Sequence, residues 1–347
     1  MRALARVDAS PRIGFGHLAR TSTLVEALRE RGAEVTFASH APSDAVRGWV
    51  ADLGCALAPV EAEPGSRDDL AATRAIAAGA ALVVIDGYVF DATFHAALRE
   101  PGRAVCVIDD LADAPVGGDV ILNGNLYGDE LTYDAPHASL SLLGPAYALV
   151  RPEFARARAD RAKRPRRADQ PARVLVTMGG ADPTRETEKA LDALDSLGAS
   201  IDAKVVLGAA NPRAPDLARR VSNLRAPGLR AEAIVGARNM GELMCWADVA
   251  VTAAGSTCLE LATVGVPGLT ITVADNQRGV AAAFASRGLL DHLGESATVT
   301  PTAIRDALVA LLGDAPKRAR MESALREAVD GSGAGRAAEA IAAHLRA

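Results

Sequence analysis

Residues 6–21, RVDASPRIGFGHLART, join a short apolar run to the start of a helical pattern through a loop with two glycines. The apolar run covers residues 4–8, and Leu18, Val25 and Leu28 recur at the spacing of one helix face. A strand that passes through a glycine turn into a helix is the opening unit of a parallel α/β sheet. This stretch therefore predicts an α/β fold whose first loop approaches a ligand.

The same alternation of apolar runs and helical patterns continues along the chain. The further apolar runs lie at residues 34–39, 82–86, 105–109, 174–178, 204–207, 249–252 and 269–273. Strands that alternate with helices indicate parallel sheets with helices on both faces. Ligands bind such sheets at the loops that follow the carboxyl ends of the strands.

The length of 347 residues predicts two domains, because one domain usually spans roughly 100–200 residues. Residues 151–172 are rich in Arg and contain three Pro, and we interpret them as a solvated linker or a linker helix rather than a phosphate-binding patch. We expect a first domain over residues 1–150 and a second over residues 173–347. The final helical stretch is expected to pack back on the first domain.

The net charge of −5 argues against nucleic acid or an anionic membrane as a partner, because both attract positive surfaces. No apolar run approaches the ~18 residues of a membrane span, and no signal segment is evident, so a cytoplasmic protein is expected. The four cysteines lie far apart and suggest neither a disulfide framework nor a zinc site. A small molecule is the expected partner, and the oligomeric state stays open.

The loop before the first helix carries the strongest candidate for chemistry. Gly14 and Gly16 allow the backbone to approach a ligand, and the helix start offers free N–H groups and positive potential. That potential disfavours the imidazolium form of His17, so we expect a neutral ring that accepts a proton. The alternative is a structural histidine that caps the helix or bonds within the core. A G-x-G-H pattern is weak evidence by itself, but its setting makes His17 the candidate general base.

Two further glycine turns follow apolar runs in the second half, at Gly179-Gly180 and at Gly255-Ser256-Thr257. Both precede helical patterns, where free N–H groups and the positive helix end bind phosphate. We expect these turns to approach the diphosphate of a nucleotide.

Acidic residues near these turns have both a functional and a structural interpretation. Glu260 has the position to accept both hydroxyls of a ribose. It also has the T-x-x-E spacing of a capping box with Thr257, and spacing alone does not separate the two interpretations. For Asp182 we favour a helix cap.

A polar cluster follows the last apolar run. Asn276 and Gln277 are candidates to bind a sugar or phosphate, whereas Arg278 has the spacing to pair with Asp275 at a helix start. No D-x-D motif is present, so neither a metal-bridged diphosphate nor a cofactor is expected.

Six motifs occur in an order that resembles a known family. They are RVDASPRIGFGHLART (6–21), VIDGYVFD (84–91), CVIDDLAD (106–113), LLGPAYALVRPEF (142–154), VLVTMGGADPT (174–184) and AAGSTCLELATVGVPGLTITVADNQR (253–278). The chain resembles the nucleotide-sugar hydrolases of pseudaminic-acid biosynthesis, which release UDP from a UDP-linked 2,4-diacetamido-2,4,6-trideoxy-altrose. That family is similar to the GT-B glycosyltransferases of the lipid II N-acetylglucosaminyltransferase type.

The resemblance implies a GT-B-like α/β fold, with two Rossmann-like domains whose parallel sheets face a central cleft. The C-terminal domain would hold UDP and the N-terminal domain would present His17 as general base. Glu260 and Asn276 match substrate-binding positions. Arg151 matches a substrate contact, with a hinge salt bridge as its alternative.

Two more residues are candidates next to the base. Tyr88 follows a predicted strand and would orient the sugar, or else serve as an interface aromatic. Arg20, close behind His17, is a candidate contact for the substrate or UDP.

The resemblance implies hydrolysis with inversion, in which His17 takes a proton from a water that attacks the anomeric carbon. Two alternatives remain. A GT-B glycosyltransferase would use the same base on an acceptor hydroxyl, and a non-catalytic nucleotide-sugar-binding protein would not require His17.

Overall fold

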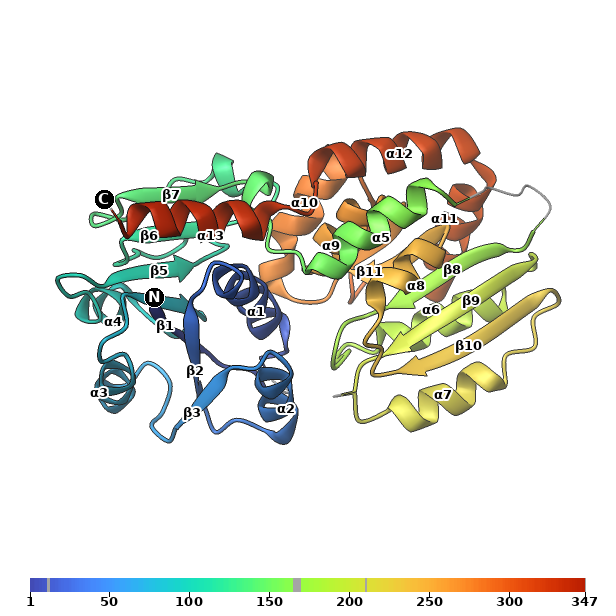
Figure 1. Cartoon of the computed structure of the whole chain (residues 1–347). Helices are drawn as coiled ribbons and strands as arrows, with labels where there is room; N and C mark the ends of the chain where they lie inside the picture. Colours follow the sequence, from blue (N-terminus) through green and yellow to red (C-terminus); the bar gives the residue numbers. More distant parts are fainter. Residues whose placement is uncertain (11–12, 165–169, 210, 347) are drawn as a thin grey trace. The chain divides into compact units, whose positions relative to one another are not determined.

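The chain divides into two compact units (Figure 1). Unit 1 comprises Met1–Arg151 and Gly331–Ala347, and unit 2 comprises Pro152–Asp330. The computed structural model describes residues 1–10, 13–164, 170–209 and 211–346. No helix within these ranges has both the length and the apolar character that crossing a bilayer requires.

Unit 1 contains a sheet of seven strands, all parallel, in the order β3-β2-β1-β4-β5-β6-β7. The strands are β1 (Arg2–Val7), β2 (Glu34–His40), β3 (Ala56–Val60), β4 (Leu82–Asp86), β5 (Ala104–Ile108), β6 (Val120–Asn123) and β7 (Leu140–Leu143). β4 and β5 are buried along their whole length, as expected for central strands that helices cover on both faces. The strand order reverses between β1 and β4, which is where ligands bind in such sheets.

Helices and 3₁₀ turns accompany the strands of unit 1. They are α1 (Gly16–Arg29), α2 (Asp44–Asp52), α3 (Arg67–Ile76), α4 (Ala92–Ala97), the 3₁₀ turns η1 (Gly128–Glu130) and η2 (Pro145–Tyr147), and α13 (Gly333–His344). Ser43, Ser66 and Asp91 cap α2, α3 and α4 by accepting a backbone N–H in the first turn. These caps fix where each helix begins.

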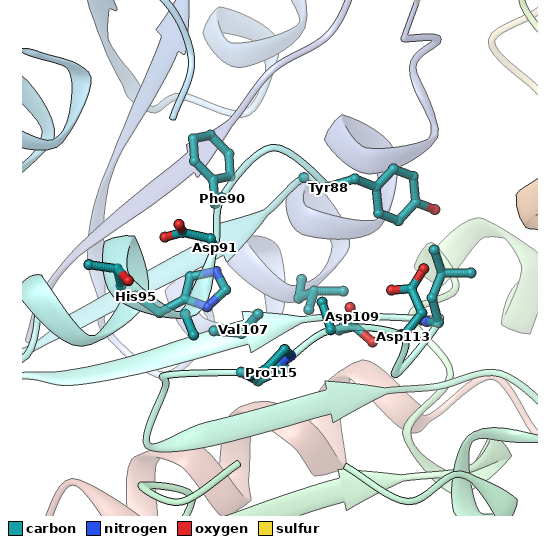
Figure 2. Close-up of a pocket in the computed structure, with 15 residues that line it drawn as sticks. Tyr88, Phe90, Asp91, His95, Val107, Asp109, Asp113 and Pro115 are labelled. Atoms are coloured by element: carbon teal, nitrogen blue, oxygen red, sulfur yellow. Dashed lines mark hydrogen bonds between the residues drawn. The ribbon is translucent and has the colours of Figure 1, made fainter. Parts of the chain in front are cut away.

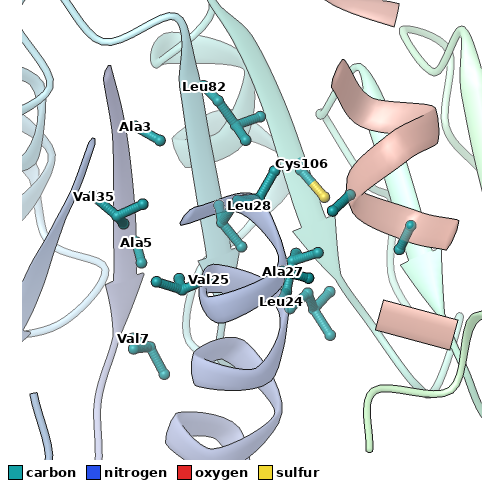
Figure 3. Close-up of a cluster of buried hydrophobic side chains, with 14 of the residues drawn as sticks. Ala3, Ala5, Val7, Leu24, Val25, Ala27, Leu28, Val35, Leu82 and Cys106 are labelled. Carbon is teal, nitrogen blue, oxygen red and sulfur yellow. The ribbon is translucent and has the colours of Figure 1, made fainter. Parts of the chain in front are cut away.

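One face of the unit 1 sheet packs on α1 and α13. Leu24, Val25 and Leu28 of α1 lie against Ala5 and neighbouring side chains of the sheet (Figure 3). The last helix, which we expected to return to the first domain, adds Ala334, Ala337, Ala338 and Ile341 to this same cluster. Unit 1 is therefore built from both ends of the sequence.

Unit 2 contains a sheet of six parallel strands in the order β10-β9-β8-β11-β12-β13. The strands are β8 (Ala172–Thr177), β9 (Ile201–Leu207), β10 (Leu229–Val235), β11 (Val249–Ala253), β12 (Gly268–Thr272) and β13 (Asp291–Glu295). The helices are α5 (Pro152–Ala162), α6 (Glu186–Asp195), α7 (Ala214–Ser222), α8 (Met240–Trp246), α9 (Thr257–Val264), the 3₁₀ turn η3 (Asp275–Gln277), α10 (Arg278–Ser286), α11 (Pro301–Gly313) and α12 (Ala315–Ala328). Each unit thus repeats the strand–helix alternation that the sequence predicts.

The first part of the Arg-rich interval is helical, one of the two forms that we expected, but it belongs to unit 2 rather than to a linker. Pro152–Ala162 forms α5, which is part of unit 2, and Phe154 is fully buried. Arg161 is buried as well and donates to the carbonyl oxygens of Met244 and Ala247. Arg161 therefore donates to the carbonyl groups at the end of α8 instead of pointing into solvent. The number of charged residues in a sequence segment does not reveal such a contact. Residues 165–169 of this interval lie outside the described residues.

Candidate active site

His17 is placed by the turn from β1 into α1. It is the second residue of α1 and is 8% exposed. Gly14 has a φ of +84°, a backbone conformation that favours glycine, and its N–H donates to the carbonyl of Ser10 at 2.7 Å. A Cβ built on Gly14 or Gly16 meets no described atom within 4 Å, so this backbone borders open space.

Asp86, the last residue of β4, holds the His17 ring. β4 pairs with β1 and places Asp86 in register with Val7. The His17 Nδ1 atom lies 2.6 Å from the Asp86 Oδ1 atom, and the Asp86 side chain is fully buried. Thr21 donates its hydroxyl to the other oxygen of Asp86 at 2.9 Å. Asp86 was absent from the candidates that the sequence suggested.

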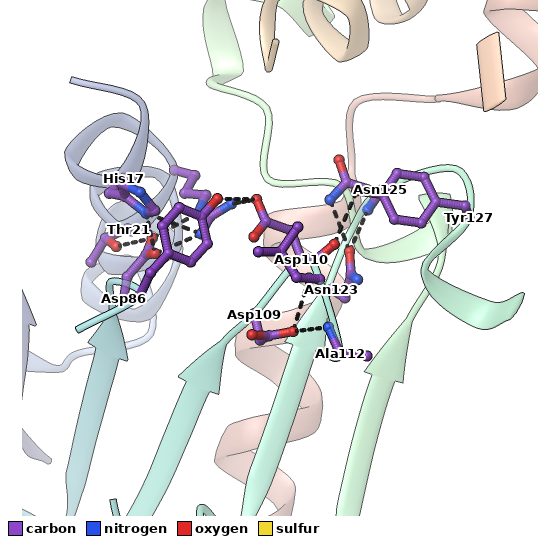
Figure 4. A network of polar contacts seen from close by, with 12 residues as sticks. His17, Thr21, Asp86, Asp109, Asp110, Ala112, Asn123, Asn125 and Tyr127 are labelled. Atoms are coloured by element: carbon purple, nitrogen blue, oxygen red, sulfur yellow. Dashed lines mark hydrogen bonds and ion pairs between the residues drawn. The ribbon is translucent and has the colours of Figure 1, made fainter. Parts of the chain in front are cut away.

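Arg20 completes a partly buried ion network around this carboxylate, and Figure 4 shows Asp86 with His17 and Thr21 in that network. It donates to Asp86 through Nε at 2.7 Å and Nη2 at 2.6 Å, and to Asp110 through Nη1 at 2.7 Å. The sequence suggested Arg20 as a contact for substrate or UDP, whereas the structure commits its guanidinium to two carboxylates. Arg20 therefore positions Asp86 in this structure.

The network determines the charge of Asp86 and the tautomer of His17. Burial raises the pKa of Asp86, but Arg20 and His17 outweigh burial and hold this pKa well below its usual value. The Arg20 Nη2 atom lies 3.1 Å from Nδ1, but it donates to Asp86 over the shorter 2.6 Å contact. The Nδ1 hydrogen of His17 therefore faces the ionised carboxylate, which leaves the Nε2 lone pair free to accept a proton.

Tyr88 flanks the His17 ring. Its ring centre lies 4.9 Å from that of His17 with the planes at 81°, an edge-on contact. Its hydroxyl donates to Asp110 at 3.1 Å, and 48% of the residue is exposed. Tyr88 thus forms an exposed wall beside the buried His17 ring.

Polar contacts continue from Asp110 to the residues after β6 (Figure 4). Tyr127 donates its hydroxyl to the carbonyl of Asp110 at 3.0 Å, and burial raises the pKa of Tyr127 to about 12. Asn123 accepts from both the backbone N–H and the side-chain amide of Asn125 at 3.0 Å. Polar residues at strand ends were the available signal for Asp86, Asp110 and Asn123, since carboxyl ends of parallel strands share one edge of a sheet.

The first glycine turn of unit 2 follows β8. Gly179 and Gly180 are exposed, and a Cβ on either meets no described atom within 4 Å. Asp182 accepts from the N–H groups of Glu186 and Thr187 at 2.8 and 3.0 Å, which confirms its predicted role as a helix cap. The turn therefore exposes the backbone of Gly179 and Gly180, while the carboxylate of Asp182 is bound to the N–H groups at the start of α6.

The second glycine turn leads into α9. Ser256 is the residue before the helix and makes no side-chain capping bond, and Thr257 is the first helical residue. The capping-box interpretation of Glu260 is therefore wrong, because that box requires Thr257 to be the cap. Glu260 lies in the first turn of α9 and is half-buried.

The loop after β12 lies beside the Gly255 turn. Gln277 accepts from the N–H of Val273 at 3.1 Å, and its Nε2 atom lies 3.6 Å from a Cβ built on Gly255. Asn276 is exposed in the same 3₁₀ turn. Arg278 pairs with Asp275 at 3.0 Å, as its spacing predicted. Because β11 and β12 are neighbours, the Gly255 turn and the loop that holds Asn276 and Gln277 lie at the same edge of the unit 2 sheet.

The predicted site residues fall into two groups, one in each unit. Unit 1 brings together Gly14, Gly16, His17, Arg20 and Tyr88, whereas the other predicted contacts belong to unit 2, apart from Arg151. Arg151 is half-buried at the boundary of unit 1 and stays a predicted contact.

Comparison with known proteins relates the chain to glycosyltransferases. Residues 208–339 match the glycosyltransferase family 28 C-terminal domain. An uncharacterized protein of Methanocaldococcus jannaschii is 25% identical over 276 residues, which cover 77% of this chain and 54% of that protein. The chain thus spans about half the length of the curated relative it matches.

Solved structures share the whole architecture. MurG of Acinetobacter baumannii has a TM-score of 0.71 at 16% identity, over 99% of this chain and 100% of that one. The glycosyltransferase VinC, in complex with dTDP, has a TM-score of 0.67 at 17% identity and full coverage of both chains. The forosaminyltransferase SpnP has a TM-score of 0.68 at 18% identity, also with full coverage of both. The fold is therefore the GT-B fold of two Rossmann-like units, which confirms the predicted fold class.

Proposed function

We propose that this protein is an inverting enzyme that acts on a nucleotide-activated sugar, with His17 as general base. The observation that carries the proposal is the buried ion network that fixes the His17 ring and leaves Nε2 available. The resemblance of the motifs narrows the reaction to hydrolysis of a UDP-linked 2,4-diacetamido-2,4,6-trideoxy sugar, which releases UDP and the free sugar.

In the proposed mechanism, Nε2 of His17 removes a proton from the attacking water. Asp86 keeps the ring in the required tautomer and stabilises the imidazolium that forms, while remaining ionised itself. Water attacks the anomeric carbon from the face opposite the diphosphate, so the configuration at that carbon inverts.

Unit 2 is proposed to hold the nucleotide. The exposed Gly179-Gly180 backbone and the start of α9 offer N–H groups to a diphosphate. Stabilised in this way, the diphosphate leaves without a separate acid. Glu260 is proposed to accept the ribose hydroxyls, and Asn276 and Gln277 to contact the phosphate or sugar.

A glycosyltransferase is the second candidate, and the relatives favour it. The chain matches the glycosyltransferase family 28 C-terminal domain, and it shares its fold with MurG, the glycosyltransferase VinC and the forosaminyltransferase SpnP. In that case Nε2 of His17 would deprotonate an acceptor hydroxyl instead of water, with the same inversion.

The test uses the purified protein and the UDP-linked diacetamido sugar in ¹⁸O-labelled water without an acceptor. Hydrolysis is expected to release UDP and to place the label on the anomeric oxygen, as read by mass spectrometry of both products. UDP release that requires an added acceptor would establish the transferase. Label in the phosphate would mean cleavage at phosphorus, and the role of His17 would then be wrong.

A further inference from the structure

Unit 1 contains a cavity of about 510 Å³ that the proposed mechanism does not use (Figure 2). Two segments line it: residues 87–95, which lead from β4 into α4, and residues 107–116 at and after the end of β5. Its volume falls in the usual range for small-molecule sites, which is roughly 300–1,000 Å³. Tyr88 belongs both to its wall and to the edge-on contact with His17, so the cavity adjoins the candidate base.

The lining of the cavity selects against anions. Asp91, Asp109 and Asp113 contribute carboxylates, and the residues that line it within the described chain include neither Lys nor Arg. A phosphate or carboxylate in this space would meet like charges without a counterion. The remaining wall is largely apolar, with Phe90 and Val116 among its side chains. The occupant is therefore uncharged or positive and partly apolar.

His95 is one of the residues that line the cavity. It is 4% exposed, and burial lowers its pKa to about 4, so the ring is neutral near pH 7. Its Nδ1 atom accepts from the N–H of Gly117 at 3.4 Å. The ring hydrogen is therefore on Nε2, and His95 forms part of the cavity wall.

We propose that this cavity binds an acylamino substituent of the sugar. An acylamino group combines a methyl group for the apolar wall, a carbonyl oxygen for the His95 Nε2–H donor, and an N–H for a carboxylate such as Asp91. A hydroxyl lacks the apolar part, and a free ammonium group leaves the His95 donor unpaired. The proposal rests on the proposed function, because Tyr88 connects the cavity to the base.

A pair of substitutions at His95 separates binding from structure. In His95→Asn the amide oxygen replaces Nδ1 and accepts from Gly117, but the cavity donor is lost. In His95→Gln the amide nitrogen replaces Nε2, so the donor is kept while the Gly117 contact is lost. A ligand role predicts a defect in His95→Asn, whereas a purely structural role predicts a defect in His95→Gln.

The experiment measures binding by calorimetry in a His17→Ala background, so that no ligand is consumed. The ligands are UDP, the UDP-linked 2,4-diacetamido sugar, and the same UDP-sugar with each acetamido group in turn replaced by an amino group. One acetamido group is expected to strengthen binding about tenfold, as one added hydrogen bond and apolar contact would. His95→Asn is expected to abolish this preference, and His95→Gln to keep it, with the affinity for UDP unchanged.

Filling the cavity provides a second test that does not depend on His95. Ala114 lines the cavity at an exposed position, so Ala114→Leu narrows the space without disturbing the core. Ala114→Leu is expected to weaken binding of the diacetamido sugar about tenfold, which is the contribution that we expect from one acetamido group. Ala71→Leu, on the exposed face of α3 and outside the cavity, is the matched control and should have no effect.

The outcomes separate this inference from the proposed function. Failure of UDP itself to bind would overturn the proposed function. Normal UDP affinity together with equal binding of acetamido and amino sugars, tighter binding of an amino sugar, or an acetamido preference that survives both His95→Asn and Ala114→Leu would overturn the cavity assignment alone.

Discussion

At the scale of single residues, the contact between His17 and Asp86 joins positions 69 residues apart in the sequence. The glycine loop identified His17, because a histidine at a helix start after two glycines is visible in a short window. Asp86 was missed, because only the sheet order, with β4 beside β1, brings it to that loop. The sequence could therefore single out His17 as a candidate base, but not the carboxylate that holds its ring.

Asp86→Asn tests whether this orientation matters for catalysis. The amide keeps the shape of the carboxylate, but it no longer selects the tautomer with Nε2 free or stabilises an imidazolium. We expect kcat/KM to fall about 10³–10⁴-fold, as for an equivalent change in a Ser-His-Asp triad, with UDP affinity unchanged. Steady-state kinetics and calorimetry measure the two quantities. A loss of less than tenfold would show that Asp86 has a structural role only.

The same substitution gives a pH dependence of stability. The pKa of Asp86 is depressed in the fold, so the carboxylate stabilises the native state above the unfolded pKa of about 4. That stabilisation is lost as the pH falls toward the depressed native pKa. Urea unfolding should therefore show the wild type more stable than Asp86→Asn near neutral pH, with the gap narrowing below about pH 4. A gap that stays constant down to pH 3 would contradict the ionised state of Asp86.

At the scale of elements, the two glycines at the turn into α1 differ in whether their backbone conformation requires glycine. Gly14 needs its left-handed backbone, so Gly14→Ala should cost about 1–2 kcal/mol of unfolding free energy. Gly16 begins a helix and has open space around a Cβ, so Gly16→Ala should change stability by less than about 1 kcal/mol. If the substrate approaches this backbone as proposed, Gly16→Ala should still raise KM at least tenfold.

Thermal unfolding and steady-state kinetics measured on both variants provide the comparison. A Gly16→Ala variant that folds normally and keeps its KM would show that the open space beside α1 is not occupied by substrate.

Most central strands were predictable from sequence, whereas the edge strands and β6 were not. The run at residues 34–39 appears as β2, and the run at 82–86 is β4 without a shift. In unit 1, β3, β6 and β7 were missed, and in unit 2, β10 and β13 were missed. Both lie at edges of the unit 2 sheet, and β10 mixes half-buried with exposed residues, so neither shows the continuous apolar run of a strand buried on both faces.

At the scale of the whole molecule, α13 belongs to the core of unit 1 although the sequence of unit 2 precedes it. Ile341 is fully buried in the cluster that contains α1, and Ile304 is fully buried in the core of unit 2. Each Ile→Ala change should cost about 2–5 kcal/mol. Ile341→Ala should lower hydrogen-exchange protection in unit 1 only, and Ile304→Ala in unit 2 only. Loss of protection in α11 on changing Ile341 would contradict the assignment of α13 to unit 1.

The alternation of strands and helices was sufficient to predict an α/β fold of parallel sheets, because most central strands carry their own apolar signal, whereas the GT-B type was implied by the resemblance of the motifs. The alternation did not place the boundary between the units at Arg151. The many arginines of α5 suggest a solvent-exposed segment, whereas Arg161 is buried. Contacts within one loop can be read from a sequence, whereas the network around Asp86 depends on which strands become neighbours.

The assignment of α13 to unit 1 also bears on biosynthesis. As the chain emerges from the ribosome, β1–β7 of unit 1 are made first, all of unit 2 follows, and the helix that completes the first core comes last. The apolar surface of α1 that α13 covers therefore stays open to water while residues 152–330 are translated. During that interval the nascent chain exposes a surface that a chaperone can bind, and unit 2 is free to fold before unit 1 is finished.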